Sequence, residues 1–529
     1  MTKLYLISPI VFCMSFVSIA QQRELKSTLD VLEYDLVIKI SDQSDTLFFG
    51  ETVKAVCVSD TSPVSLELTG QRQDGRGMIV HSVSSSGLIL RFEQKSDRVI
   101  FSGMNPRIGD TIVVQLDYSG IPADGLVIGK NKYGDRTIFG DNWPNRAHHW
   151  FACNDHPSDK AKVHFNVVVP NGMKVIANGR LIKEEIFKDS AIFEYRTDYE
   201  LPTKVIVIGV ADFRVANFGP VNSTGIPVSA WVYPQDEQKG FYDLELAPDI
   251  LAWFENKIAA YPFDKLANVQ STTRYGGMEN ASCIFYDEHA IDGNRSMENL
   301  IAHEIAHQWF GNSASEKDFS HLWLSEGFAT YLTNVYLLES KGEEVFYRQM
   351  EKDKARIFDF AKTIALPVID TISEDLNNLL NANAYQKGSW ILHMLRMNLG
   401  DEIFWRSIRS YYRRYQFSNA SSEALKMVFE EECTCELDQF FEQWLHFSTN
   451  PQLEVKIKKK RNSLRVSIVQ MQQDLFDLQV ELGIQLKDGQ VITKTVHVRN
   501  RSNNAVFALD GKPVNVSIDP KRKVLMSVR

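Results

Sequence analysis

The stretch NLIAHEIAHQWFGN, residues 299–312, carries two histidines four positions apart in a run of helix-compatible residues. On an α-helix, residues i and i+4 lie above one another, so the imidazoles of His303 and His307 converge on one point. Such a pair can bind zinc, and Glu304 lies where a general base for a metal-bound water is needed. The stretch therefore predicts a helix with a catalytic metal site, although two histidines on an ordinary amphipathic helix remain the alternative for this stretch alone.

A third ligand follows downstream. A catalytic zinc commonly takes three protein ligands and leaves one position open for water. Eighteen residues separate His307 from Glu326, which lies at the start of a second helix-periodic segment, SEGFATYLTNVYLLES. Two helices packed against each other would bring this carboxylate to the histidine pair. We predict one Zn²⁺ per chain, held by His303, His307 and Glu326.

Two further segments flank this pair of helices. In RYGGMENASCIFY, residues 274–286, two adjacent glycines permit close backbone approach to a ligand, and the glutamate beside them can bind a cationic group. In ANAYQKGSW, residues 382–390, Tyr385 lies at the head of a predicted helix. Taken alone, the first segment is a turn beside a strand and the second is a packed aromatic with a hydrogen-bonded tip.

Taken together, the motifs GGMEN, HEIAH, WLSEG and YQKG, in this order, resemble those of a known enzyme family. The combination is similar to the zinc aminopeptidases of the aminopeptidase N family, gluzincin metallopeptidases that also include the leukotriene hydrolases. HHWFACNDHPSDKA, residues 148–161, and FEQWL, residues 441–445, resemble further segments of that family. The resemblance implies a thermolysin-like, mainly helical catalytic domain.

The resemblance also implies a reaction, the removal of N-terminal residues from peptides with a free N-terminus. The implied catalytic residues are Glu304, as general base, and Tyr385, as hydrogen-bond donor to the oxyanion. The implied substrate-binding residues are those of the GGMEN motif, where Glu279 holds the α-ammonium: Gly276, Gly277, Met278, Glu279 and Asn280. Two alternatives stay open, an endopeptidase or epoxide hydrolase on the same zinc site, and a catalytically inactive binding scaffold.

One substrate contact that is common in this family has no assigned residue in this sequence. Members of the family often place a glutamine or glutamate of the N-terminal domain beside the substrate amine. In this sequence Asp141 or a neighbouring residue occupies that region, so we assign no residue to this contact.

The chain predicts an α+β multidomain protein. Short β-rich pieces such as YDLVIKI and KVIVIGV, separated by turn residues, predict an N-terminal β-sheet domain over residues 24–237. Apolar residues at spacings of three and four then predict the mainly helical catalytic domain, residues 238–448. Alternating strands return over residues 449–529 and predict a small C-terminal β-sandwich.

The first 20 residues have the pattern of a secretory signal. Lys3 precedes an apolar run that ends in small residues, which predicts a cleaved signal peptide over residues 1–20 and export to the periplasm or the extracellular space. The alternative is an uncleaved membrane anchor, because the run is only slightly short of the ~20 residues of a spanning helix. No later segment is apolar enough to span a membrane.

The amino-acid composition of the chain limits the classes of partner that it is expected to bind. At 44% hydrophobic residues and a formal net charge of −9, the 529-residue chain is an ordinary globular protein, and its negative charge argues against nucleic-acid binding. After removal of the signal, five cysteines remain, an odd number that excludes a complete disulfide framework. The sequence leaves the oligomeric state open.

Overall fold

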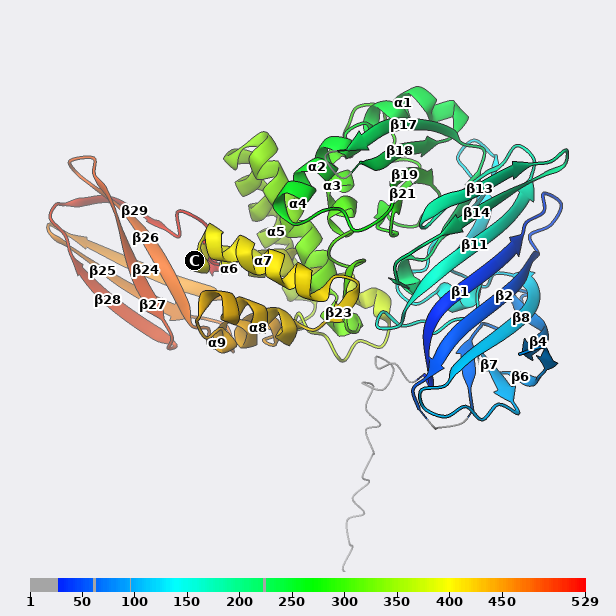
Figure 1. Ribbon diagram of the computed structural model, residues 1–529. Helices are drawn as coiled ribbons and strands as arrows, with labels where there is room; N and C mark the ends of the chain where they lie inside the picture. Colours follow the sequence, from blue (N-terminus) through cyan, green and yellow to red (C-terminus); the bar gives the residue numbers. More distant parts are fainter. Residues whose placement is uncertain (1–26, 60–62, 96, 222–224) are drawn as a thin grey trace, which may run out of the picture.

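The computed structural model describes residues 27–59, 63–95, 97–221 and 225–529 (Figure 1). The predicted signal peptide lies outside the described residues. A β-rich N-terminal part and a C-terminal β part lie at opposite ends of the molecule, with the helices between them (Figure 1). This arrangement confirms the predicted fold class.

The N-terminal part is built on a nine-stranded sheet. Its long strands alternate buried and exposed side chains, as expected for a sheet with one face on a core. The order is β13-β14-β11-β1-β2-β8-β4-β5, with β15 paired to β11. The strands are β1 (Leu29–Lys39), β2 (Leu47–Cys57), β4 (Gly77–Ser85), β5 (Leu88–Ile89), β8 (Thr111–Ile121), β11 (Lys160–Pro170), β13 (Arg180–Ile186), β14 (Ser190–Arg196) and β15 (Leu201–Pro202).

Two smaller sheets complete this part. One has the order β12-β16-β10-β9, with β12 (Lys174–Ala177), β16 (Ile208–Ala211), β10 (Arg136–Gly140) and β9 (Leu126–Lys130). The other has the order β3-β7-β6, with β3 (Ser65–Glu67), β7 (Arg98–Ser102) and β6 (Arg91–Lys95).

The segment KVIVIGV is extended only in its second half. Residues Thr203–Val205 form a 3₁₀ turn before β16 begins. The buried amide of Asn178 donates to the Val205 carbonyl at 2.8 Å, and that of Asn142 donates to the Ile206 carbonyl at 2.6 Å. Because these side chains satisfy the carbonyls, the first half of the segment has no need of a partner strand.

The central part combines a mixed sheet with the helices. The sheet order is β17-β18-β19-β21-β20, with β20 at the edge. Its strands are β17 (Arg214–Val221), β18 (Ile226–Val232), β19 (Leu266–Ser271), β20 (Gly277–Met278) and β21 (Cys283–Asp287). The pairing of β18 with β19 joins residues 214–232, which precede the predicted boundary at residue 238, to this sheet. The domain boundaries themselves stay a prediction.

Nine α-helices are described in this part of the chain. Apolar residues at spacings of three and four cover the inner face of several, which explains their packing around α4. The helices are α1 (Glu237–Leu244), α2 (Ala247–Lys257), α3 (Glu298–Ala306), α4 (Trp323–Lys341), α5 (Glu343–Thr363), α6 (Gly388–Leu399), α7 (Asp401–Tyr415), α8 (Ser422–Cys433) and α9 (Asp438–Leu445). Two short strands, β22 (Ala314–Glu316) and β23 (Ser418–Ala420), pair in parallel.

The C-terminal part contains a four-stranded and a three-stranded sheet, as a β-sandwich requires. The first has the order β28-β25-β24-β30, with β28 (Ser502–Ala508), β25 (Ser463–Gln470), β24 (Gln452–Lys460) and β30 (Ser527–Val528). The second has the order β27-β26-β29, with β27 (Val491–Val498), β26 (Leu478–Leu486) and β29 (Pro513–Ile518).

Two lysines, Lys204, which is buried, and Lys160, which is half-buried, join the N-terminal β domain to the segment around β22. Lys204 and Glu316 form an ion pair with an Nζ–Oε1 distance of 2.5 Å, and both side chains are at most 1% exposed. The ammonium of Lys160 donates to the carbonyls of Ser313 at 2.8 Å and Ser418 at 2.9 Å. A buried charge is tolerated when it is paired and hydrogen-bonded, so these contacts fix the position of the first domain against the helices.

Among the five cysteines in the described part of the chain, Cys433 and Cys435 form a disulfide, and Cys57, Cys153 and Cys283 are buried thiols. Burial raises the pKa of Cys283 to about 12, so this thiol stays protonated. Within the described residues, no helix has both the length and the apolar character needed to cross a membrane.

Candidate metal and substrate site

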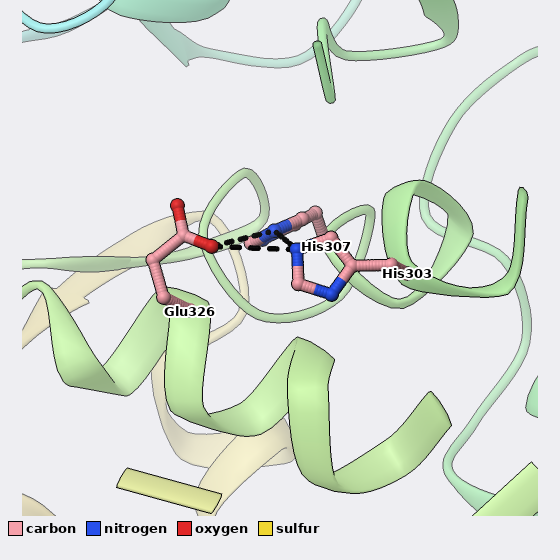
Figure 2. A group of neighbouring side chains, drawn as sticks. All are labelled: His303, His307 and Glu326. Atoms are coloured by element: carbon pink, nitrogen blue, oxygen red, sulfur yellow. Dashed lines mark hydrogen bonds and ion pairs between the residues drawn. The ribbon is translucent and has the colours of Figure 1, made fainter. Parts of the chain in front are cut away.

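Three side chains converge at the end of α3 and the start of α4. His303 lies in the last turn of α3, and His307 caps the helix. Figure 2 shows the Glu326 carboxylate directed at the two imidazoles. Its Oε2 lies 3.4 Å from Nε2 of His303 and 3.3 Å from Nε2 of His307, and the two Nε2 atoms are 3.1 Å apart.

This donor set fits a zinc ion. Two imidazole nitrogens and one carboxylate oxygen lie within 4.8 Å of one another, and zinc binds these ligands at 2.0–2.2 Å in tetrahedral geometry. A tetrahedron with such bonds has edges of about 3.3 Å, close to the three separations observed here. His307 and Glu326 are 1% and 5% exposed, whereas His303 is 20% exposed and faces the approach from solvent.

The orientation of His307 is set by its second ring nitrogen. Nδ1 lies 3.2 Å from the carbonyl of Phe310 and 3.1 Å from Oγ of Ser325. Donation from Nδ1–H to that carbonyl leaves the Nε2 lone pair free to bind a metal. The turn that brings the carbonyl back passes through Gly311, whose φ of 120° is a conformation that only glycine adopts easily.

The charges of the two carboxylates at this site differ. Burial opposes ionisation of Glu326, but the imidazoles of His307 and His303 hold its pKa below the ordinary value. For Glu304, burial raises the pKa well above the ordinary value. One carboxylate therefore stays ionised as a ligand, and the other is suited to hold a proton.

The carboxylate of Glu304 lies directly beneath β20. A Cβ placed on Gly277 would clash with Oε1 of Glu304, so the strand passes over this side chain only because residue 277 is glycine. The sequence predicts that this glycine allows close backbone approach to a ligand, and this stays a prediction. In the structure the glycine also makes room for the side chain of Glu304.

Tyr385 lies on a π-helical turn, Asn383–Lys387, that precedes α6. Its ring is parallel to that of His303, with ring centroids 6.1 Å apart. Burial, together with the carboxylates of Glu326 and Glu279, raises the pKa of Tyr385 well above its ordinary value. The hydroxyl therefore stays protonated and can donate a hydrogen bond.

Two glycines bring Tyr385 and Glu326 together. A Cβ on Gly327 would lie 2.8 Å from Cα of Gly388, so the backbones of α4 and α6 are in direct contact where they cross. Each glycine belongs to one of the two motifs, WLSEG and YQKG. The close crossing places the first turn of α4 against the turn that carries Tyr385.

The GGMEN segment follows the edge of the central sheet. Gly277 and Met278 form β20 and pair with Tyr286 and Phe285 of β21. The Glu279 side chain comes next, 5% exposed, and its Oε1 has no hydrogen-bond partner among the described residues. Such a buried carboxylate oxygen is costly unless a ligand pairs with it.

One cavity of about 60 Å³ joins these residues. The predicted residues on its wall are Gly277, Met278, Glu279, His303, Glu304, His307, Glu326 and Tyr385. Gly276 and Asn280 are not on the wall: the carbonyl of Gly276 accepts from the amide of Asp287, and Asn280 is fully buried.

Three wall residues were absent from the predicted set: Trp143, Tyr275 and Leu380. Trp143 comes from the N-terminal β domain, and its ring makes edge contacts with Tyr275 and Phe319. Asp141 is fully buried and paired with Arg146 at 2.5 Å, away from the cavity wall. The sequence around Trp143 resembles any packed aromatic, so no local pattern marks it as a wall residue.

Residues 242–444 match the Peptidase family M1 domain. Among similar proteins, a leucyl aminopeptidase of Saccharolobus solfataricus is 24% identical over 84% of this chain and 58% of its own length. Aminopeptidase M1-B of Oryza sativa subsp. japonica is 26% identical over 94% of this chain and 58% of its own length. An alanine/arginine aminopeptidase of Saccharomyces cerevisiae is 24% identical over 83% of this chain and 54% of its own length.

The chain thus spans somewhat over half the length of these relatives. The matched residues contain the three converging side chains, Glu304 and Tyr385. The central part of this chain, residues 242–444, is therefore similar to the peptidase family M1 domain.

Proposed function

We propose that this protein is a zinc-dependent aminopeptidase that removes residues from the N-terminus of peptides. The observation that carries the proposal is the cavity that places Glu279, a buried carboxylate whose Oε1 has no hydrogen-bond partner among the described residues, beside a complete metal-ligand triad and Glu304. The names of the similar proteins, all aminopeptidases, support it.

His303, His307 and Glu326 would hold the zinc ion. When bound, the ion supplies Lewis acidity, which polarises the scissile carbonyl and lowers the pKa of water. The chain fixes the three ligand atoms at the edge lengths of a tetrahedron and leaves the exposed side of His303 open to the cavity.

Glu304 acts as general base and then as general acid. Its carboxylate lies on the cavity wall, and burial raises its pKa, which favours acceptance of a proton from the attacking water. The same group then donates that proton to the leaving amine. A carboxyl group with a raised pKa accepts a proton more readily than an ordinary carboxylate, which suits it to take the proton and pass it on.

Tyr385 stabilises the oxyanion. Because its raised pKa keeps the hydroxyl protonated, it can donate to the carbonyl oxygen as negative charge develops there. The parallel packing of its ring on His303 holds the tyrosine beside a ligand of the metal.

Glu279 distinguishes an aminopeptidase from an endopeptidase. The α-ammonium of a peptide would supply the cation that this buried carboxylate lacks, and a charge-assisted contact of this kind also fixes the distance from the N-terminus to the cut. The proposed substrates are therefore peptides with a free N-terminus.

The test is turnover of a panel of aminoacyl arylamides, with and without a chelator, beside a matched pair of free and N-acetylated peptides. We expect chelator-sensitive turnover of the free substrates and cleavage of the acetylated peptide at least ~30-fold more slowly, from 2–5 kcal/mol for the ammonium contact. Internal cuts in the acetylated peptide would favour an endopeptidase. Turnover of an epoxide alone would favour an epoxide hydrolase, and metal binding without any turnover would favour an inactive binding scaffold.

We also propose that the protein is exported. Residues 1–20 have the composition of a cleaved signal, and the Cys433–Cys435 disulfide is of a kind found mainly in oxidising compartments. N-terminal sequencing of the protein from cell fractions tests this proposal. The expected first residue is Gln21, in a periplasmic or extracellular fraction.

A further inference from the structure

We propose that Gln308 and Asn312 are positioning residues that hold Glu279 at a fixed distance from the metal ligands and so set where the substrate amine binds. This inference rests on the proposed function and deepens it. It concerns two buried amides that no step of the mechanism above uses.

The two amides converge on one atom. The side chain of Gln308 donates to the backbone carbonyl of Glu279 at 2.8 Å, and the side chain of Asn312 donates to the same carbonyl at 2.6 Å. Both amides are fully buried. A carbonyl oxygen has two lone pairs, so this acceptor is fully used by donors from a single segment.

That segment also carries the metal ligands. Gln308 directly follows His307, and the amide N–H of Asn312 donates to the carbonyl of His307 at 3.1 Å. The chain that orients a ligand therefore also holds the backbone of Glu279. The substitution of either side chain removes a bond to Glu279 but keeps the backbone bond between Asn312 and His307.

Gln308 holds the GGMEN segment at a second point. Its Oε1 accepts from the backbone amide of Ser282 at 2.9 Å, while its Nε2 donates to Glu279. One side chain thus closes the loop from residue 279 to residue 282. The last strand pair before this loop is Met278 with Phe285, so the position of Glu279 is not fixed by the sheet itself.

The position of the carboxylate depends on this backbone. Oε1 of Glu279 has no hydrogen-bond partner among the described residues, so no bond to that oxygen orients it. Small displacements of a binding group from its required position are costly in catalysis. The two amides are therefore expected to act on amine binding and to leave metal binding unchanged.

The experiment compares the calorimetric affinities of an amino-acid hydroxamate and its des-amino counterpart. Both bind the metal through the hydroxamate, but only the first carries an ammonium for Glu279. For Asn312→Ala and Gln308→Met we expect the affinity of the amino compound to fall about 3- to 10-fold, as for loss of one hydrogen bond. The affinity of the des-amino compound and the zinc content should stay at wild-type values.

A matched control is Asn419→Ala. Asn419 also donates to two carbonyls, those of Pro157 at 2.7 Å and Glu316 at 3.0 Å, but at the domain junction. Its loss should leave both affinities unchanged. Asn312→Ser keeps a short hydrogen-bond donor and should retain part of the preference for the amino compound. If Asn312→Ala does not fold, Gln308→Met alone tests the inference.

Two results would overturn the inference. Equal weakening of both hydroxamates would show that the amides maintain the metal site, and wild-type affinities in both variants would show that they do not position Glu279. If the wild-type protein itself binds both hydroxamates equally well, the amine contact in the proposed function is wrong. This outcome is seen with the wild-type protein alone and does not depend on the variants.

Discussion

Glu304 lies beside the metal ligands without being one of them. Exchange of one of its carboxylate oxygens for an amide nitrogen should therefore impair catalysis and leave zinc binding intact. Glu304→Gln keeps the shape of a side chain that fits beneath Gly277 but removes its capacity to take a proton. We expect kcat to fall by roughly 10²–10⁴-fold, the contribution of a general base, with zinc content unchanged. Steady-state kinetics with metal analysis checks this, and near wild-type turnover would require another base.

A substitution of Tyr385 tests the proposed hydrogen bond to the oxyanion. Tyr385→Phe removes the hydroxyl and leaves the ring parallel to His303. The expected result is a fall in kcat of about 10²–10³-fold with little change in KM, because the contact forms only as charge develops. A wild-type kcat would reassign this tyrosine to packing.

Trp143 is the wall residue contributed by the N-terminal β domain. Trp143→Ala removes the indole from a small cavity and should shift the preference toward larger N-terminal residues. The ratio of kcat/KM for a bulky and a small aminoacyl arylamide is the measurement. An unchanged ratio would show that the indole does not limit the first side chain.

The contrast between these residues explains what the sequence could predict. His303, His307 and Glu304 lie in one helical stretch, whose geometry fixes their relative positions before any tertiary contact is known. Trp143 and Leu380 reach the same cavity from segments more than 200 residues apart, through domain packing. No local pattern encodes that packing.

At the scale of elements, the crossing of α4 and α6 positions the site. Gly327→Ala would force a methyl group against the backbone of Gly388 and separate the helices that carry Glu326 and Tyr385. We expect a loss of roughly 1–3 kcal/mol in the free energy of unfolding, as for overpacking, together with weaker zinc binding. Denaturant titration and metal competition provide the measurements.

A matched control exists in the N-terminal β domain. A Cβ on Gly129 would meet no atom within 4 Å, and its φ is not positive, so Gly129→Ala should leave the unfolding midpoint nearly unchanged. If Gly327→Ala behaved in the same way, the crossing would not need its glycines.

Sequence patterns predicted some of the secondary-structure elements and missed others. The alternation of YDLVIKI and the 3–4 spacing of SEGFATYLTNVYLLES predicted β1 and α4, because one buried face decides each pattern. The π-helical turn of Tyr385 and the 3₁₀ turn at Thr203–Val205 were not predicted. Both depend on bonds to distant side chains or on packing: Asn383, for example, donates to the carbonyl of Leu366.

For the whole molecule, two buried carboxyl groups in the N-terminal β domain link stability to pH. Burial raises the pKa of Glu51 to about 8 and that of Asp159 to about 7. In the folded state these two groups keep protons that the unfolded state has released. Their contribution to the free energy of unfolding should therefore fall as pH rises from about 4, the unfolded-state pKa, to about 8.

Urea midpoints at pH 5 and pH 8 measure this slope. Glu51→Gln keeps an oxygen for the hydrogen bonds from Tyr118 at 2.7 Å and the Ala152 amide at 2.9 Å, and removes one titrating group. The variant should be less sensitive to pH than the wild type over the same range. An equal slope in both proteins would mean that Glu51 does not titrate in this window.

The ion pair between Lys204 and Glu316 has a consequence for how such a chain can evolve. Glu316 ends the strand that follows the metal-binding segment, so a central domain separated from its neighbour would keep a buried carboxylate without a counter-ion. Recombination that exchanged the N-terminal β domain for an unrelated domain would therefore destabilise the central domain. These two domains should be inherited together, as one unit of selection.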